Sequence, residues 1–453
     1  MRFRLQTFRW PLAVNVIFFA LTFCLDLSIP QNLRWHDWPD AYDYLHLSQV
    51  SLLDKEFYFP HTNAQYSSRP FTVPLIYKTA LSNPDIIIPV QKFFHALGAF
   101  LMVFAVSLFL SRDVVKYFFM VCTYLLMGWW NIAGWATIIL SESLSLSLMF
   151  CWIASFLIFV NKQKIFLLGI HILTAVLLSF SRDTWPYVIL FFYVLCCCLF
   201  FVCERSLFKP LVALVCVSVA ILLVQNYSMR TGERYKIPLT NTIAIRIAFD
   251  ADYLHWFAAH RMPCTDSLRR DFPKAADYDT KRGKLYEIYG DPGYTKLLSW
   301  VMSRGKNTYM KFLITHPRYT FLFEETKPQL DRIFSYNLFY TENLVNADTA
   351  KGYSSPLQNI FPLFNPLLAA VLSVISVFVY RKRKLFIGLM PLLLMIVFGF
   401  NVLVSYNADA LEVERHLFVT NIMVQLSGFL SVALLFDAAI NSGEDLNRSV
   451  IKL

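Results

Sequence analysis

Long apolar stretches, separated by connections that carry most of the charges, dominate the chain. A helix needs about 20 consecutive, mostly apolar residues to cross the hydrocarbon core of a bilayer. Stretches of about this length occupy residues 10–29, 90–110, 114–135, 140–160, 164–181, 185–203, 208–226, 359–380, 384–405 and 416–437. The pattern predicts an all-α, polytopic membrane protein with about ten transmembrane helices.

Two polar segments are too long to be simple turns between these helices. They are residues 30–89 and residues 227–358. Within the second, Tyr294–Met302 and Tyr309–Phe323 combine aromatic and charged residues, a pattern typical of amphipathic helices that lie along a membrane surface. We therefore expect an N-terminal transmembrane module over 1–226, a large loop over 227–358 and C-terminal transmembrane helices over 359–453.

The basic residues fall in alternate connections, and this orients the chain. The basic connections contain Arg2, Arg4, Arg9, Arg112, Lys116, Lys162, Lys164, Arg205, Lys209, Arg381–Lys384, Arg448 and Lys452. Because such connections face the cytoplasm, residues 30–89 and 227–358 are expected on the opposite side. The predicted location is a bacterial inner membrane, or the ER membrane in a eukaryote, with both segments in the periplasm or lumen.

The composition agrees with a membrane protein and argues against other classes. Of the 453 residues, 57% are hydrophobic and 16% are charged, whereas about a quarter of the residues in soluble domains are charged. The net charge of +10 comes largely from residues beside the apolar stretches, so membrane lipids and not nucleic acids are the expected partners. The nine cysteines contain no C-x-x-C spacing, which argues against a disulfide framework or zinc site. No small-residue cleavage site follows the first apolar stretch, so a retained first helix is expected rather than a signal peptide.

The sequence is compatible with two roles for Asp40 in the first polar segment. From Asp40 onward the sequence predicts a helix with Asp40, Tyr44 and Leu47 on one face. Asp40 follows Pro39, which suits a helix N-cap, a position where Asp is strongly favoured. A carboxylate at this place can also act as a general base.

Two further charged residues, Arg69 and Glu142, lie on the expected outer side of the membrane. Arg69 precedes Pro70 and Pro74, so it can anchor the chain at the interface or grip a phosphate with its planar guanidinium. Glu142 lies at the start of the 140–160 stretch, where the helix dipole favours an acid. An ionisable group beside the membrane core is also typical of a functional site.

Short motifs follow one another along the chain, all of them on the expected outer side of the membrane. They are Asp40-x-x-x-Tyr44-Leu45, Arg69-Pro70-x-x-x-Pro74-Leu75, Leu140-Ser141-Glu142-Ser143-Leu144, Ser181-Arg182-Asp183, Thr315-His316-Pro317-Arg318-Tyr319 and Glu414-Arg415-His416-Leu417. Their order and common placement resemble the GT-C superfamily, polytopic glycosyltransferases that use polyprenyl-phosphate sugars, such as protein O-mannosyltransferases and lipid A aminoarabinose transferases. The chain departs from that pattern at His416, where a Tyr is usual, and in spacing Asp37, Asp40 and Asp43 where the superfamily often has adjacent acids.

The resemblance implies transfer of a sugar from a polyprenyl-phosphate carrier to an acceptor glycan, lipid or protein. It implies that Asp40, in the catalytic segment 30–89, is the general base and that Glu142 is a second catalytic carboxylate. The arginines expected to bind the donor phosphate are Arg69, Arg182 and Arg415. The residues expected to line the substrate are Tyr44, Asp43, His316 and His416.

Other groups with the residue types of a site are interpreted as structural. Asp250-Ala251-Asp252 resembles the D-x-D of metal-dependent sugar transferases, but so short a motif is weak without structural context. We interpret it as a solvated loop feature, and neither a divalent metal nor another cofactor is indicated. His171, inside an apolar stretch, is interpreted as a helix-packing group.

Two other functions share parts of this pattern. An O-antigen or polysaccharide polymerase or ligase also has many spans and one large outer loop, but would rely on Arg and His of that loop rather than on an aspartate of the first. A flippase or transporter of lipid-linked sugars would place ionisable groups and helix breaks at mid-membrane. Here the charges gather at helix ends, which favours the glycosyltransferase.

Overall fold

The structure is a computed structural model that describes residues 9–29, 39–60, 68–203, 205–273, 278–321, 361–380, 385–410 and 413–450. This part of the chain is built from helices and contains no β-strand, so the all-α prediction is confirmed. The expected loop residues 30–38, 61–67 and 322–358 lie outside the described residues, as do Arg2, Arg4 and the Arg381–Lys384 run.

Six helices in the described part are long and apolar enough to cross a membrane. They are α1 (Arg9–Ser28), α5 (Pro84–Ser107), α8 (Ser141–Lys162), α11 (Arg205–Thr231), α23 (Leu385–Ala408) and α24 (Val413–Val450). Three shorter apolar helices accompany them, namely α9 (Ile165–Ser179), α10 (Trp185–Cys203) and α22 (Pro366–Tyr380). At 1.5 Å per residue, a helix of the length of α9 spans roughly 22 Å, less than the roughly 30 Å hydrocarbon core.

The stretch expected to form one helix over 114–135 is broken, so that expectation is wrong. Helix α6 (Asp113–Gly128) ends at Gly128, and Trp129 is extended, with φ −62° and ψ 129°. A short helix, α7 (Trp130–Ala133), and a 3₁₀ turn over Gly134–Thr137 follow. The break lets the buried Trp129 ring stack on Phe361, with the ring centroids 5.4 Å apart. Tertiary packing of one large ring therefore overrides the local apolar pattern.

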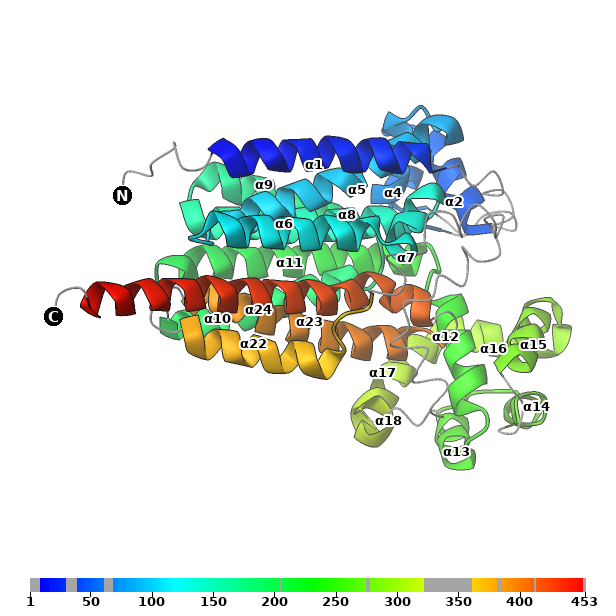
Figure 1. Cartoon of the computed structure of the whole chain (residues 1–453). Coiled ribbons are helices and arrows are strands. Elements are labelled where there is room, and N and C mark those ends of the chain that lie inside the picture. The colour runs from blue at the N-terminus through cyan, green and yellow to red at the C-terminus, as the bar shows by residue number, and fades with distance from the viewer. Residues whose placement is uncertain are drawn as a thin grey trace.

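The long helices run side by side as one bundle, and the short helices gather at one end of it (Figure 1). We call this the loop end. It carries α2 (Pro39–Gln49), α3 (Lys55–Tyr58) and α4 (Thr72–Thr79) of the first polar segment. From the second it carries α12 (Lys236–Thr242), α13 (Ala251–Ala259), α14 (Thr265–Asp271), α15 (Tyr278–Gly290), α16 (Thr295–Trp300), α17 (Lys306–Thr315) and α18 (Pro317–Phe321). Helix α1 begins and α24 ends at the opposite end (Figure 1).

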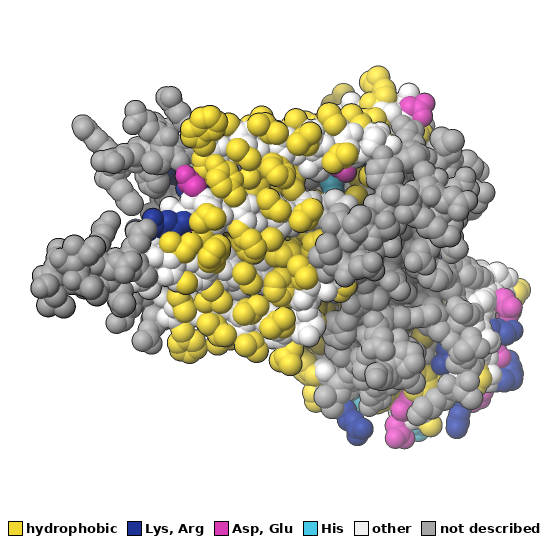
Figure 2. Space-filling view, in the orientation of Figure 1, with side chains coloured by type: hydrophobic (Ala, Val, Ile, Leu, Met, Phe, Trp, Pro, Cys, Tyr) yellow, Lys and Arg dark blue, Asp and Glu magenta, His cyan; other side chains and the backbone are white. Residues whose placement is uncertain are grey.

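Helix α8 lies inside the bundle, whereas α1 and α11 lie on its outside. In the most apolar window of α8, 94% of residues are buried, against 22% in α1 and 28% in α11. Gly98 lets α5 approach α8 closely, because a Cβ there would lie 3.2 Å from the Ser147 carbonyl oxygen. The outer helices expose large apolar side chains such as Leu25, Leu223 and Phe378, and an apolar band covers the side of the bundle (Figure 2). Such a band is typical of a membrane protein.

Candidate functional site

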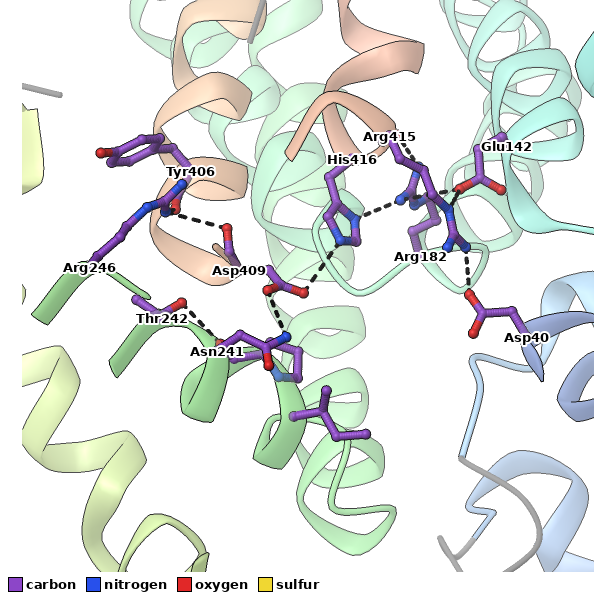
Figure 3. A network of polar contacts seen from close by, with 12 residues as sticks. Asp40, Glu142, Arg182, Asn241, Thr242, Arg246, Tyr406, Asp409, Arg415 and His416 are labelled. Carbon is purple, nitrogen blue, oxygen red and sulfur yellow. Dashed lines mark hydrogen bonds and ion pairs between the residues drawn. The ribbon is translucent and has the colours of Figure 1, made fainter. Parts of the chain in front are cut away.

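Five segments that lie far apart in the sequence meet at the loop end of the bundle. Asp40 lies in the first turn of α2, Arg69 precedes α4, and Glu142 lies in the first turn of α8. Arg182 lies in the turn between α9 and α10, and Arg415 lies in the first turn of α24. Ion pairs join all five side chains. Figure 3 draws four of these side chains, those of Asp40, Glu142, Arg182 and Arg415. We call these five residues the arginine–carboxylate cluster.

Asp40 is the residue that two arginines share. Its Oδ2 accepts a hydrogen bond from Arg415 Nη2 at 2.7 Å, and its Oδ1 pairs with Arg69 Nη2. Helix α2 begins at Pro39, so Asp40 is the second residue of the helix rather than its N-cap. The capping interpretation is therefore wrong. The carboxylate is engaged by cations, with 23% of the side chain exposed.

Glu142 is the fully buried member of the cluster. Its side chain has no exposed surface, and its Oε1 lies 2.5 Å from Arg415 Nε and 3.6 Å from Arg182 Nη2. The Ser141 hydroxyl donates to its Oε2 at 3.4 Å. An unpaired buried carboxylate would be strongly unfavourable, so the two guanidinium groups are what allow Glu142 to occupy this position.

Arg69 connects the cluster to the rest of α2. Its Nε and Nη2 donate to Asp43 Oδ2 at 3.0 and 2.7 Å, and its guanidinium lies 5.5 Å from the centroid of the Tyr44 ring. Tyr44 in turn packs edge-on against Tyr77, whose hydroxyl donates to the Leu140 carbonyl at 3.0 Å. The expected substrate-lining residues Asp43 and Tyr44 therefore lie beside the arginine that the sequence singles out.

Backbone contacts hold the separate segments in register. The Thr72 amide at the start of α4 donates to the Phe180 carbonyl at 3.1 Å, and the Phe71 and Phe180 rings lie 4.6 Å apart. These contacts fix the segment that carries Arg69 against the turn that carries Arg182. Arg182 Nη1 also donates to the backbone carbonyl of Arg415 at 3.3 Å. The positions of the three arginines are thus coupled through the backbone as well as through carboxylates.

The electrostatics of the cluster favour the charged forms of Asp40 and Arg69. Burial raises the pKa of Asp40, but the charges and hydrogen bonds of Arg69 and Arg415 outweigh it and bring the pKa well below its usual range. Burial lowers the pKa of Arg69, but Asp40, Tyr44 and Asp43 together raise it above the ordinary value. A carboxylate with a lowered pKa is a weak base, so Asp40 is a weak base as long as both arginines hold it.

A second set of polar residues extends the cluster toward the large loop (Figure 3). Arg182 Nη2 lies 2.7 Å from His416 Nδ1, and His416 Nε2 lies 3.6 Å from Asp409 Oδ2. Asn241 of α12 donates to Asp409 Oδ1 at 3.2 Å, and Tyr289 of α15 donates to Asn241 Oδ1 at 3.2 Å. The expected substrate residue His416 thus contacts a cluster arginine, whereas Asp409 and Asn241 were not predicted from the sequence.

The motif around His316 builds a different feature. His316 follows α17, and its ring stacks on Phe312, with the centroids 4.2 Å apart, and packs edge-on against Tyr253 and Trp256. Its Nδ1 lies within hydrogen-bond distance of Thr315 and of the Phe312 carbonyl. These are contacts of the aromatic core of the large loop, so the structure does not bring His316 together with the arginine–carboxylate cluster.

The Asp250–Asp252 motif lies at the start of a helix rather than in a loop, and His171 packs between helices as expected. Asp250 is the N-cap of α13 and accepts hydrogen bonds from the amides of Asp252 and Tyr253. His171 is buried in a hydrogen-bonded group with Ser155 and Tyr193, at 2.9 and 2.6 Å. Among the described residues, no group of three or more His, Cys, Asp or Glu side chains is arranged to hold a metal ion.

No family model matches the chain. No curated protein matches it. No solved structure matches it.

Proposed function

We propose that the chain is a membrane-embedded glycosyltransferase that moves a sugar from a polyprenyl-phosphate carrier to an acceptor. The observation that supports this most is the meeting of three arginines and two carboxylates from five distant segments at one end of an apolar bundle. A lipid carrier reaches such a site sideways through the bilayer, so its phosphate arrives at helix ends, where the cluster lies.

The chemistry of sugar transfer requires both kinds of charge. The acceptor hydroxyl oxygen attacks the anomeric carbon, the bond from that carbon to the phosphate oxygen breaks, and the lipid phosphate leaves with the bonding electrons. Arginines that bind the phosphate offset the charge that develops on it, and in our proposal these are Arg69, Arg182 and Arg415. Asp40 accepts the proton of the acceptor hydroxyl, and Glu142 keeps Arg182 and Arg415 at the site before the donor binds.

The charges of the site imply an exchange of partners when the donor binds. Among the described residues, the three arginines face three carboxylates, those of Asp40, Asp43 and Glu142, so their positive charges are matched one for one. A phosphate therefore has to compete with a carboxylate for a guanidinium group. When the phosphate draws Arg69 or Arg415 away, Asp40 loses a contact that lowers its pKa and becomes a better base. In this proposal, binding of the donor activates the base.

The proposal includes a topology. The helices α1, α5, α6, α8, α9, α10, α11, α22, α23 and α24 would each cross the membrane, with the shorter ones completed by flanking residues. The loop end would face the periplasm of a bacterium or the ER lumen of a eukaryote. This orientation is supported by basic residues in or beside the helix ends at the other end of the bundle, namely Arg112, Lys162, Lys164 and Lys209.

The direct test uses the purified full-length protein in detergent with radiolabelled polyprenyl-phosphate sugars of several kinds. Our proposal expects release of polyprenyl phosphate from at least one donor, and loss of that release in the Asp40→Asn variant. Arg270→Lys, at a surface ion pair with Asp271, serves as the matched control and should retain activity. Folded protein that leaves every donor intact, but moves it across the membrane of reconstituted vesicles, would instead establish a transporter.

A further inference from the structure

The contact between Arg182 and His416 fixes the state of the histidine ring. Arg182 Nη2 lies 2.7 Å from His416 Nδ1. A guanidinium nitrogen can only donate a hydrogen bond, so Nδ1 has to accept and cannot carry a proton. His416 is therefore neutral in this arrangement, with its one ring proton on Nε2.

The other side of the ring faces a carboxylate. His416 Nε2 lies 3.6 Å from Asp409 Oδ2, with 29% of the histidine side chain and 13% of the aspartate side chain exposed. Asn241 donates to the other oxygen, Asp409 Oδ1, at 3.2 Å. A carboxylate behind one nitrogen of an imidazole orients the ring and stabilises the imidazolium that forms when the other nitrogen takes up a proton. Here that other nitrogen is Nδ1, which Arg182 covers.

We propose that the Asp409–His416 pair is a proton-binding site that opens at His416 Nδ1 when Arg182 turns to the donor phosphate. This inference rests on the proposed function, in which Arg182 is a phosphate-binding residue. While Arg182 occupies Nδ1, a protonated His416 would have no acceptor to offer and would place a second cation 2.7 Å from the guanidinium. Once Arg182 leaves, that repulsion falls, and Asp409 favours the charged ring.

The charged groups around His416 all bear on this exchange. Arg182 opposes protonation from the turn between α9 and α10, and Asp409 favours it from the segment before α24. Glu142 Oε1 of α8 lies 3.6 Å from Arg182 Nη2, and Arg415 directly precedes His416 in the chain. When Arg182 moves, an imidazolium at His416 also replaces part of the positive charge beside Glu142. The donor phosphate and the proton therefore bind cooperatively.

The test measures proton uptake on binding rather than activity. Dihexyl phosphate is a suitable probe, because a phosphate diester keeps one negative charge across neutral pH and exchanges no proton itself. Calorimetric titration of the full-length protein in detergent, repeated in buffers with different heats of ionisation, gives the number of protons taken up per probe bound. We expect the unsubstituted protein to take up protons as the probe binds at mildly acidic pH, and fewer at alkaline pH.

Three variants test which residue takes up the proton. In His416→Gln, the probe should still bind but the uptake should be lost. In Asp409→Asn, the uptake should be reduced and should require lower pH, because the imidazolium loses its carboxylate. His255→Gln, at an exposed histidine of α13, is the matched control and should leave the uptake unchanged.

The outcomes separate this inference from the proposed function. Binding of the probe without proton uptake, or with uptake that persists in His416→Gln, overturns the proton site and leaves the phosphate site standing. Failure of the probe to bind the folded, unsubstituted protein at any pH overturns both. If His416→Gln does not fold, the pH dependence of uptake in Asp409→Asn decides instead, and an unchanged profile overturns the inference.

Discussion

Arg415 Nη2 lies 2.7 Å from Asp40 Oδ2, although 375 positions separate these residues in the chain. The same guanidinium contacts the buried Glu142 through Nε at 2.5 Å. One side chain of the last helix therefore ties together the first polar segment and the inner helix of the bundle. This bridging position makes Arg415 the residue whose substitution best tests whether the cluster acts as a unit.

Arg415→Lys is expected to impair activity about as much as Arg415→Ala. Lysine keeps the positive charge but offers one nitrogen, so it cannot reach Glu142 and Asp40 with the geometry of the guanidinium fork. Loss of one preorganised group that stabilises developing charge lowers kcat by about 100- to 1000-fold. Release of polyprenyl phosphate measures the effect, with Arg270→Lys as control. Full activity of Arg415→Lys would show that only the positive charge at position 415 matters, and not the geometry of the guanidinium group.

Glu142→Gln is expected to destabilise the fold itself. The substitution keeps the volume of the side chain but removes the carboxylate that pairs with the buried Arg182, and it leaves Arg415 with Asp40 alone. Removing one partner of a buried ion pair lowers stability by about 3–5 kcal/mol. Unfolding in detergent with increasing SDS measures this, and Glu56→Gln, at an exposed position of α3, is the control. An equal midpoint for the two variants would contradict the structural role of Glu142.

The sequence predicts the helical part of this fold well, because its cause is local. Each expected apolar range overlaps a helix. Within the described residues, only the helix expected over 114–135 is interrupted, where Trp129 leaves the helical conformation and stacks on Phe361. The ring that Trp129 contacts belongs to a residue more than 200 positions away, so the local sequence pattern does not predict the break. The number of helices that cross the membrane stays a prediction.

The candidate site was predictable only in part, for a related reason. Glu142, Arg182 and Arg415 stand out as charged residues at the ends of apolar stretches, and Asp40 and Arg69 belong to motifs of the first polar segment. The structure joins all five. Asp409 is equally a charge near a helix end, but the sequence gives no motif that links it to Asn241, 168 positions away. His316 was expected at the site from its motif, yet its neighbours in space are the aromatic rings of α13 and α17.

Two segments at the loop end should be accessible from the same side of the membrane. Leu53→Cys and Ile314→Cys replace residues that are 98% and 77% exposed. Made in a Cys264→Ser background, both should react with an impermeant thiol reagent in intact cells, whereas Lys164→Cys, in the connection between α8 and α9, should react only after lysis. Labelling of only one of the first two in intact cells would contradict the proposed crossing pattern.

The contribution of Asp40 to stability should depend on pH in one direction. Its pKa in the folded protein lies well below the usual range, because the charges of Arg69 and Arg415 outweigh burial. A group with a lowered folded pKa stabilises the fold above its unfolded pKa, and this stabilisation is lost as the pH falls toward the folded value. The difference in unfolding free energy between the unsubstituted protein and Asp40→Asn should therefore be constant from about pH 8 to about pH 5 and shrink below about pH 4. A difference that changes between neutral and mildly alkaline pH would mean that another group is responsible.

Asp40→Asn should change phosphate binding and catalytic activity in opposite directions. The substitution keeps the shape of the side chain but removes the charge that competes for Arg69 and Arg415. Dihexyl phosphate should therefore bind about tenfold more tightly, since a hydrogen bond to a charged group contributes about 1.5–3 kcal/mol. Activity should fall by at least about 100-fold, because an amide cannot accept the proton of the acceptor hydroxyl.

A purely structural Asp40 gives a different result in the same variant. If its only task is to hold the two arginines in place, their loss of order should weaken binding of the diester and lower activity together. Asp54→Asn is the matched control, because Asp54 is an exposed N-cap of α3 and asparagine keeps that cap. It should change neither quantity. Weaker binding in Asp40→Asn, or tighter binding with normal turnover, would each refute Asp40 as a base that the donor releases from its arginines.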